Sequence, residues 1–117
     1  DIRFESFCEH HLAPIIGAAH VAYIPQGRVV GISKLARLVD VFSKRLQVQE
    51  KMTSQIAETL QRALKPIGVA VLVEGEHHCM CTRGVHKTST SMISSAFTGE
   101  FLKKQKFKDE FYKIIGK

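Results

Sequence analysis

Two short clusters of cysteine and histidine, far apart in the chain, constrain the fold more than any other feature of this sequence. Residues 8–11 are Cys-Glu-His-His and residues 77–81 are His-His-Cys-Met-Cys, and together they contain all three cysteines and four of the six histidines. Thiolate sulfur and imidazole nitrogen are the ligands that zinc prefers. A fold that uses both clusters in one metal site must bring residues 8–11 close to residues 77–81.

The spacing within the clusters favours an open zinc site. Cys8 and His11 form a C-x-x-H pair, and one distant cysteine, either Cys79 or Cys81, would supply a third ligand. Three protein ligands leave a fourth position for water, which is the pattern of catalytic zinc sites. The alternative is a closed site that uses all of these residues, and it would indicate a metal-stabilised binding module.

Two further histidines are candidates for proton transfer. His10 lies beside the predicted ligands and is not needed as one, and His77 precedes Cys79 by two residues. The pKa of an ordinary histidine is close to neutral pH, so an unligated imidazole near a metal can both donate and accept protons. We therefore expect His10 and His77 to face the same cleft.

The positive charge of the chain predicts a negatively charged ligand. Seventeen Lys and Arg residues stand against 11 Asp and Glu residues, which gives a net charge of +6. Lys34, Arg37 and Arg83 are suited to hold an anionic substrate, because two of them lie near a predicted helix N-terminus and the third follows the second cluster. The lysine-rich run 103–108 is interpreted as a solvated helix face, so nucleic acid is not an expected partner.

Length and composition indicate one domain, residues 1–117, in an ordinary globular protein that is 44% hydrophobic and 24% charged. No apolar run approaches the length that spans a bilayer, so no membrane partner is expected. The odd number of cysteines, two of them one residue apart, argues against a disulfide framework. Thiols that stay reduced predict a cytoplasmic protein.

The order of elements predicts an α+β fold. Residues 12–24 and 28–32 are expected to form a hairpin, and Ser33 is expected to cap the helix that follows. Apolar residues at helical spacing predict helices over 33–46 and 49–65. Residues 69–81 and 88–98 are expected as strands, and the chain closes with a helix whose predicted apolar side is Phe107, Phe111, Ile114 and Ile115. This order favours a four-stranded antiparallel sheet with two helices between strands 2 and 3, helices on one face, and a helical tail.

Four segments, in this order and spacing, resemble the GTP cyclohydrolase I family. They are residues 6–11 (Ser-Phe-Cys-Glu-His-His), 31–37 (Gly-Ile-Ser-Lys-Leu-Ala-Arg), 47–50 (Gln-Val-Gln-Glu) and the pattern His77-x-Cys79-x-x-x-Arg83-Gly84. The resemblance covers essentially the whole chain. It implies the tunnelling fold and a chain that corresponds to the catalytic core, without the helices that precede this core in the family.

The resemblance implies an enzyme that opens the guanine imidazole ring of GTP, releases formate and forms 7,8-dihydroneopterin triphosphate, the first step of folate or tetrahydrobiopterin biosynthesis. It implies that Cys8, His11 and Cys79 bind Zn²⁺, with Cys81 outside the motif. By the same resemblance, His10 assists the attack of water on the imidazole carbon. His77 is then the acid–base residue of the later rearrangement.

The resemblance also implies how the substrate is held. Glu50 matches the carboxylate that binds the guanine amide and amino edge, with Gln49 next to it, and two N–H donors on one carboxylate give both affinity and discrimination. The triphosphate contacts implied by the resemblance are Ser33, Lys34, Arg37 and Arg83. The family assembles as a decamer of two stacked pentamers with active sites between subunits. The resemblance thus implies an allosteric homodecamer and leaves open whether a regulatory protein binds the rings.

Two alternatives belong to other classes. The metal-stabilised binding module would close its site with Cys8, His11, Cys79 and Cys81 and could dock nucleic acid through the lysine-rich tail, but it leaves Glu50 unexplained. A related tunnelling-fold enzyme acting on another purine or pterin would share the glutamate, but the Cys-Glu-His-His segment speaks against it.

Overall fold

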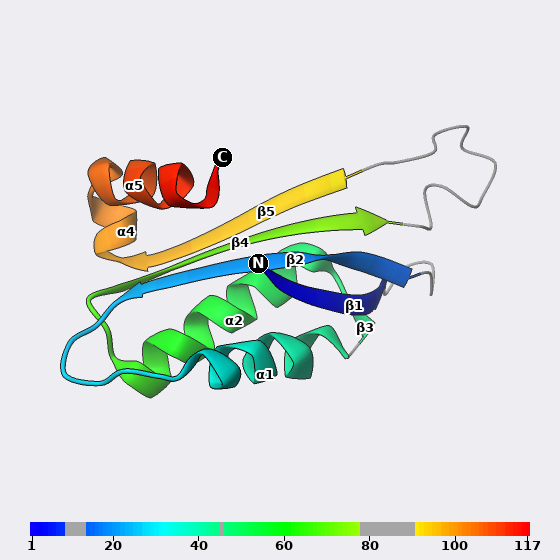
Figure 1. Cartoon of the computed structure of the whole chain (residues 1–117), viewed down its shortest axis with the longest axis horizontal. Coiled ribbons are helices and arrows are strands. Elements are labelled where there is room, and N and C mark those ends of the chain that lie inside the picture. The colour runs from blue at the N-terminus through cyan, green and yellow to red at the C-terminus, as the bar shows by residue number, and fades with distance from the viewer. Residues whose placement is uncertain (9–13, 45, 78–90) are drawn as a thin grey trace.

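An antiparallel sheet of four long strands forms the centre of the molecule (Figure 1). The computed structural model describes residues 1–8, 14–44, 46–77 and 91–117. The long strands are β1 (Ile2–Cys8), β2 (Pro14–Ile24), β4 (Gly68–His77) and β5 (Ser91–Gly99). A two-residue strand, β3 (Leu46–Gln47), pairs in parallel with the end of β1, so the order across the sheet is β3-β1-β2-β4-β5. The predicted four-stranded antiparallel sheet is confirmed, with this short strand added at one edge.

Helices cover both faces of the sheet. Helices α1 (Ile32–Ser43) and α2 (Gln49–Leu64) lie between β2 and β4 in the chain and pack together on one face, as predicted. Helices α4 (Glu100–Lys103) and α5 (Gln105–Ile115) cover the opposite face over β4 and β5 (Figure 1). The expectation that helices occupy one face only was therefore wrong. No helix in the described parts of the chain is both long and apolar enough to cross a bilayer.

Strand β4 explains why the sheet needs two helical layers. Its alternate residues Val69, Val71 and Val73 are fully buried against α1 and α2, and Met52 and Ile56 of α2 pack among them. The intervening residues, Ala70 and Leu72, are also buried and face Phe101 and Phe111 of the C-terminal helices. A strand that is apolar on both sides must be covered on both sides, because successive side chains point to opposite faces.

The predicted hairpin between residues 12–24 and 28–32 was wrong. The antiparallel partners of β2 are β1 and β4, and residues 28–31 form no strand. The backbone N–H of Val30 instead donates to the Tyr23 hydroxyl at 2.9 Å, and the Arg28 guanidinium donates to the carbonyl of Ala63. These two hydrogen bonds, each between a side chain and the backbone, hold the connection. Strand β1 was not predicted, although its inward residues Phe4 and Ser6 alternate as a strand requires.

The predicted N-cap of α1 was also wrong by two residues. Gly31 occupies the cap position in an extended conformation, and its carbonyl accepts the N–H groups of Lys34 and Leu35. No side-chain hydrogen bond caps this helix. Because the helix begins at Ile32, Ser33 is its second residue and lies inside the first turn. Glycine is acceptable at an N-cap, since only a few tenths of a kcal/mol separate it from serine there.

Helix α1 ends at Ser43, three residues before the predicted end, because Leu46 pairs with β1 as part of β3. The other boundaries follow the predictions closely. Helix α2 ends at Leu64, one residue before the predicted end, and Lys65 adopts the left-handed conformation that terminates it. Strand β4 spans Gly68–His77 and β5 spans Ser91–Gly99, while the predicted strand residues 78–81 and 88–90 lie outside the described residues. Within the tail helix Phe111 is buried as predicted, but Ile114 is 76% exposed, so its assignment to the apolar side was wrong.

Candidate active site

The ends of β1 and β4 define one end of the sheet as the candidate active site. Ser6 lies opposite Ile15, and Ile15 lies opposite His77 on its other side, so these three residues form one row across β1, β2 and β4. Cys8 and His77 therefore end their strands at the same end of the sheet (Figure 1). The segments that follow them, 9–13 and 78–90, contain His10, His11, Cys79, Cys81 and Arg83, which lie outside the described residues.

The N-terminus of α2 lies at this same end. Strand β3 pairs with β1 through Phe7 opposite Leu46 and Cys8 opposite Gln47, and α2 begins two residues later. Glu50 is in the first turn of α2 with its side chain exposed. A carboxylate in this position is favoured by the helix dipole, and it remains free to accept hydrogen bonds from a ligand. Cys8, His77 and Glu50 thus come from three elements that meet at one end of the sheet.

Gln49, the residue before Glu50, is placed differently. Its side chain is buried, and its amide nitrogen donates to the carbonyls of Val73 and Met92 and contacts the Ser94 hydroxyl. The side chain therefore points into the protein, between α2 and strands β4 and β5. The predicted contact between Gln49 and substrate stays a prediction, whereas this network is a feature that the sequence pattern did not reveal.

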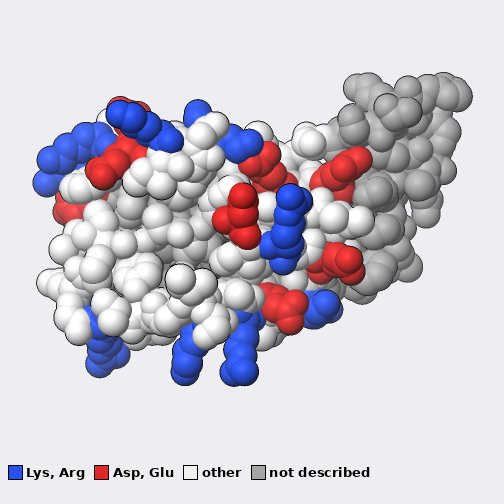
Figure 2. Space-filling model, viewed as in Figure 1, with Lys and Arg blue, Asp and Glu red and all other residues white. Residues whose placement is uncertain are grey.

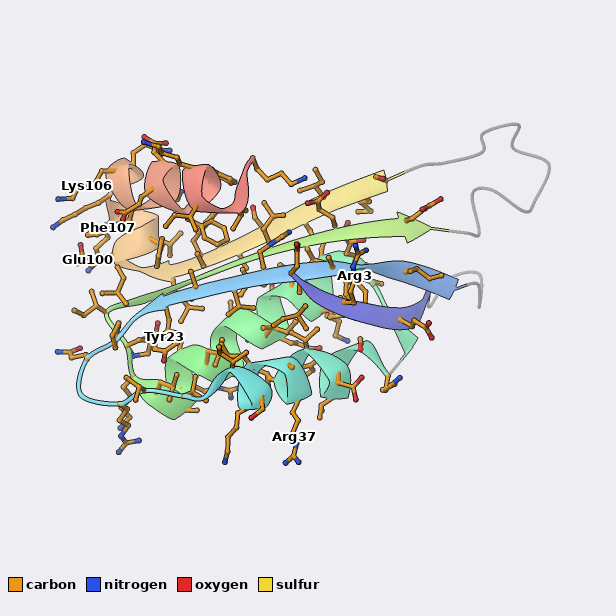
Figure 3. The ribbon with its side chains drawn as sticks, viewed as in Figure 1. Arg3, Tyr23, Arg37, Glu100, Lys106 and Phe107 are labelled. Atoms are coloured by element: carbon orange, nitrogen blue, oxygen red, sulfur yellow. The ribbon has the colours of Figure 1, made fainter. Side chains whose placement is uncertain are left out.

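The predicted triphosphate ligands of α1 lie away from this end within one chain. Helix α1 follows the connection from Ile24, which pairs with Gly68 at the opposite end of the sheet. Ser33, Lys34 and Arg37 are all exposed. Arg37 projects away from the sheet (Figure 3), and basic side chains extend from the molecule along the α1 edge (Figure 2). A single chain therefore does not bring these three residues to Cys8 and His77.

The lysine-rich tail forms an exposed face on α4 and α5, as predicted, but the charge there is mixed. Lys104 pairs with Glu100 at 3.4 Å, and the ammonium group of Lys106 lies 5.1 Å from the centre of the Phe107 ring. Red and blue side chains alternate over these helices (Figure 2). The tail is therefore not a uniformly basic surface.

A second group of charged residues lies on the face of the sheet opposite α1. Burial lowers the pKa of His20, although the neighbouring Glu74 carboxylate acts to raise it. A hydrogen bond from Lys117, at 2.7 Å, lowers the pKa of Glu74. His20 and Glu74 border a cavity of about 250 Å³ that Arg3 also lines. His20 lies in β2, within the segment 12–24 that was predicted to be extended.

The donor set at the sheet end fits zinc. Among the described residues, no three His, Cys, Asp or Glu side chains gather into a metal site. Of the predicted ligands, Cys8 ends β1, and His11 and Cys79 belong to the segments that follow β1 and β4 in the chain. Two thiolates and one imidazole suit zinc better than the harder divalent cations, which prefer oxygen ligands.

The topology defines the tunnelling-fold class, because two helices lie between the second and third long strands of an antiparallel sheet. A solved structure described as the archaeosine synthase QueF-Like in the apo form shares this fold, with a TM-score of 0.65 and 23% sequence identity. The similarity covers 83% of this chain and 87% of that one.

Within this class, the chain belongs to the GTP cyclohydrolase I family, whose profile matches residues 1–116. A protein named GTP cyclohydrolase 1 from Maricaulis maris is 57% identical over 98% of this chain, and its namesake from Brucella canis is 56% identical over the same share. The matched region is 56% and 54% of those two proteins. The chain thus spans about half the length of the curated relatives it matches.

Proposed function

We propose that this chain carries the catalytic residues of a zinc-dependent GTP cyclohydrolase I. The reaction opens the guanine imidazole ring of GTP by hydrolysis, releases formate and rearranges the remainder to 7,8-dihydroneopterin triphosphate, the entry to folate or tetrahydrobiopterin. The observation that carries the proposal is the family match over residues 1–116. The placement of Cys8, His77 and Glu50 at one end of the sheet supports it. Thiolate ligands favour reducing surroundings, so we propose that the reaction takes place in the cytoplasm.

Zinc would be held by Cys8, His11 and Cys79. When bound, zinc would act as a Lewis acid and make water nucleophilic near neutral pH. His10, next to a ligand, moves a proton at the ring nitrogen beside the carbon under attack. His77 provides the acid and base for the later opening of the sugar and the rearrangement.

Substrate recognition divides between the purine and the phosphates. Glu50 accepts two N–H groups from the guanine edge, with Gln49 beside it, and adenine cannot offer the same pair. Ser33, Lys34, Arg37 and Arg83 bind the triphosphate. Because α1 presents its residues away from the Cys8 end, we propose that Ser33, Lys34 and Arg37 reach the active site of a neighbouring subunit.

Open sheet edges support the assembly that this arrangement needs. Among the described strands, β5 has a neighbour only on its β4 side, and β3 covers only the last two residues of β1. Unpaired edges of this length are usually covered or paired in soluble proteins. We propose that subunits join edge to edge into pentamers and that two pentamers stack. A regulatory protein would then bind the assembled ring. Co-elution of the two proteins in size-exclusion chromatography would test this interaction.

A turnover assay tests the proposal. Protein loaded with zinc is incubated with GTP, and formate release and pterin absorbance are followed together. Equal rates support the complete reaction, and formate without pterin would mean that ring opening occurs without rearrangement. Absence of both, in protein that demonstrably holds zinc and forms rings, would contradict the proposal and favour the binding module.

A further inference from the structure

A buried glutamine joins α2 to two strands at the candidate active site. Gln49 is only 1% exposed, and its amide nitrogen lies 3.1 Å from the Val73 carbonyl of β4 and 2.9 Å from the Met92 carbonyl of β5. Backbone carbonyls can only accept hydrogen bonds, so the nitrogen end of the amide must point toward them. One side chain thus connects the first residue of α2 to both strands.

Two hydroxyl groups complete the network. The Thr53 hydroxyl donates to the backbone carbonyl of Gln49 at 2.8 Å and lies 2.7 Å from the Ser94 hydroxyl. The Ser94 hydroxyl in turn is 3.1 Å from the side-chain amide nitrogen of Gln49. Thr53 is one turn along α2, and Ser94 is in β5. The network therefore joins the first turn of α2 to β5 through two routes.

Gly75 makes room for the glutamine on β4. A Cβ atom at Gly75 would lie 2.5 Å from the Gln49 side-chain oxygen and 2.9 Å from the Ile15 side chain. The Gln49 amide therefore lies directly over the strand, two residues before β4 ends at His77. A larger residue at position 75 would displace it.

The network restricts the first turn of α2 to one arrangement. A buried amide without partners costs about 1–3 kcal/mol, so any shift of the helix start that breaks these hydrogen bonds is unfavourable. The next residue, Glu50, is exposed at the same helix start. We propose that Gln49 is a positioning residue, whose buried amide fixes the first turn of α2 and thereby the Glu50 carboxylate. Only the role of Glu50 rests on the proposed function.

The chain contains a matched control on the same helix. Gln61, near the other end of α2, accepts a hydrogen bond from the Thr98 hydroxyl of β5 at 2.6 Å and donates to the Pro66 carbonyl at 3.2 Å. Both glutamines therefore connect α2 to a hydroxyl residue of β5. Only Gln49 is next to a candidate substrate-binding residue.

The test compares Gln49→Met with Gln61→Met. Amide hydrogen exchange over residues 49–53 is measured first, without nucleotide, and steady-state kinetics with GTP follow. We expect Gln49→Met to speed exchange in this turn about tenfold and to raise KM for GTP about tenfold, because the hydrogen bonds of the amide to the Val73 and Met92 carbonyls are lost. The kcat should change much less, since binding of guanine by Glu50 is present before and during the reaction. Gln61→Met should leave both quantities near those of the unmodified protein.

Conservative variants at Thr53 provide the rescue experiment. Thr53→Ser keeps the hydroxyl and should preserve exchange and KM, whereas Thr53→Val removes it and should change both in the direction of Gln49→Met. If KM for GTP rises in proportion to the exchange rate at residues 49–53 across these variants, the result would support a positioning role for Gln49.

Three results would overturn the inference. Unchanged exchange at residues 49–53 in Gln49→Met with a raised KM would make Gln49 a direct substrate contact. Faster exchange with an unchanged KM would make the role of Gln49 purely structural. An equal rise of KM in Gln61→Met would show that the rise does not depend on the start of α2. If the unmodified protein failed to bind GTP, the proposed function would fail, while the exchange measurement would still decide whether Gln49 fixes the helix start.

Discussion

The hydroxyl of Tyr23 accepts a hydrogen bond from the backbone N–H of Val30 at 2.9 Å, across the connection that leads from β2 into α1. This contact lies where the sequence predicted a hairpin. It anchors the segment directly before the start of α1. The position of this helix start determines where the proposed triphosphate ligands Ser33, Lys34 and Arg37 lie.

Replacing Tyr23 with phenylalanine should therefore loosen the start of α1. We expect the free energy of unfolding to fall by about 1 kcal/mol, because the N–H group of a half-buried residue loses its partner. Urea denaturation measures the change. Tyr112→Phe is the control, since the Tyr112 ring packs on Phe97 and Phe111 and no hydrogen bond of its hydroxyl appears among the described residues. Equal losses in the two variants would contradict a special role for the Tyr23 hydroxyl.

Glu50 offers a direct test of guanine recognition. Glu50→Gln replaces an acceptor of two N–H groups with a side chain that can accept only through one oxygen, and hydrogen bonds to a charged group contribute about 1.5–3 kcal/mol. We expect kcat/KM for GTP to fall by roughly 10- to 100-fold. Glu58→Gln, on the same helix and also exposed, should leave it unchanged. Similar kinetics for both variants would remove Glu50 from the site.

The two models of the metal site differ in Cys81. In the open site, Cys8→Ser should lose zinc and turnover together, and Cys81→Ser should keep both. His10→Ala should retain zinc and lose about 100- to 10,000-fold in turnover, which is the usual contribution of an acid–base residue. Zinc content by atomic emission, measured beside formate release, checks all three variants. Release of zinc from Cys81→Ser would favour the closed four-ligand site.

The His20 environment predicts how stability depends on pH. Because the pKa of His20 is lowered in the folded protein from its ordinary value of 6.5, the unfolded chain binds the proton more readily. The free energy of unfolding should therefore decrease as the pH falls through about 6.5. Glu74, whose pKa is also lowered, adds a further loss when the pH falls below its ordinary value of 4.5.

The measurement is the difference in stability between the unmodified protein and His20→Gln at several pH values, which cancels the other histidines. The difference should shift in favour of the variant as the pH falls from about 7.5 to 5.5. A constant difference across this interval would mean that His20 titrates equally in both states.

Periodicity was sufficient for the helices of this fold and insufficient for its first strands. The apolar residues of α2 recur every fourth position, and Met52, Ile56 and Leu60 are buried as that spacing requires. Residues 28–32 are as apolar as a strand, but their backbone is held by Tyr23 and Arg28, and long-range side-chain contacts of this kind leave no periodic pattern.

The candidate site divides in the same way. Residue types and spacing identified Cys8 and His77, and the resemblance to the GTP cyclohydrolase I family identified Glu50. The strand register places these residues at one end of the sheet. The buried position of Gln49 could not be predicted, because a glutamine beside a glutamate at a helix start looks like two exposed polar residues. Its partners Met92 and Ser94 are more than 40 residues away in the chain.

The open edges of β1 and β5 have a consequence for the stability of this protein at low concentration. If the edges pair between subunits, each contact that covers them removes folded protomer from the equilibrium with unfolded chain, so folding and association become one linked process. The midpoint of thermal unfolding would then rise with protein concentration, and a dilute sample would unfold earlier than a concentrated one. The same backbone groups, left unpaired in a partly assembled chain, would present a template for aggregation.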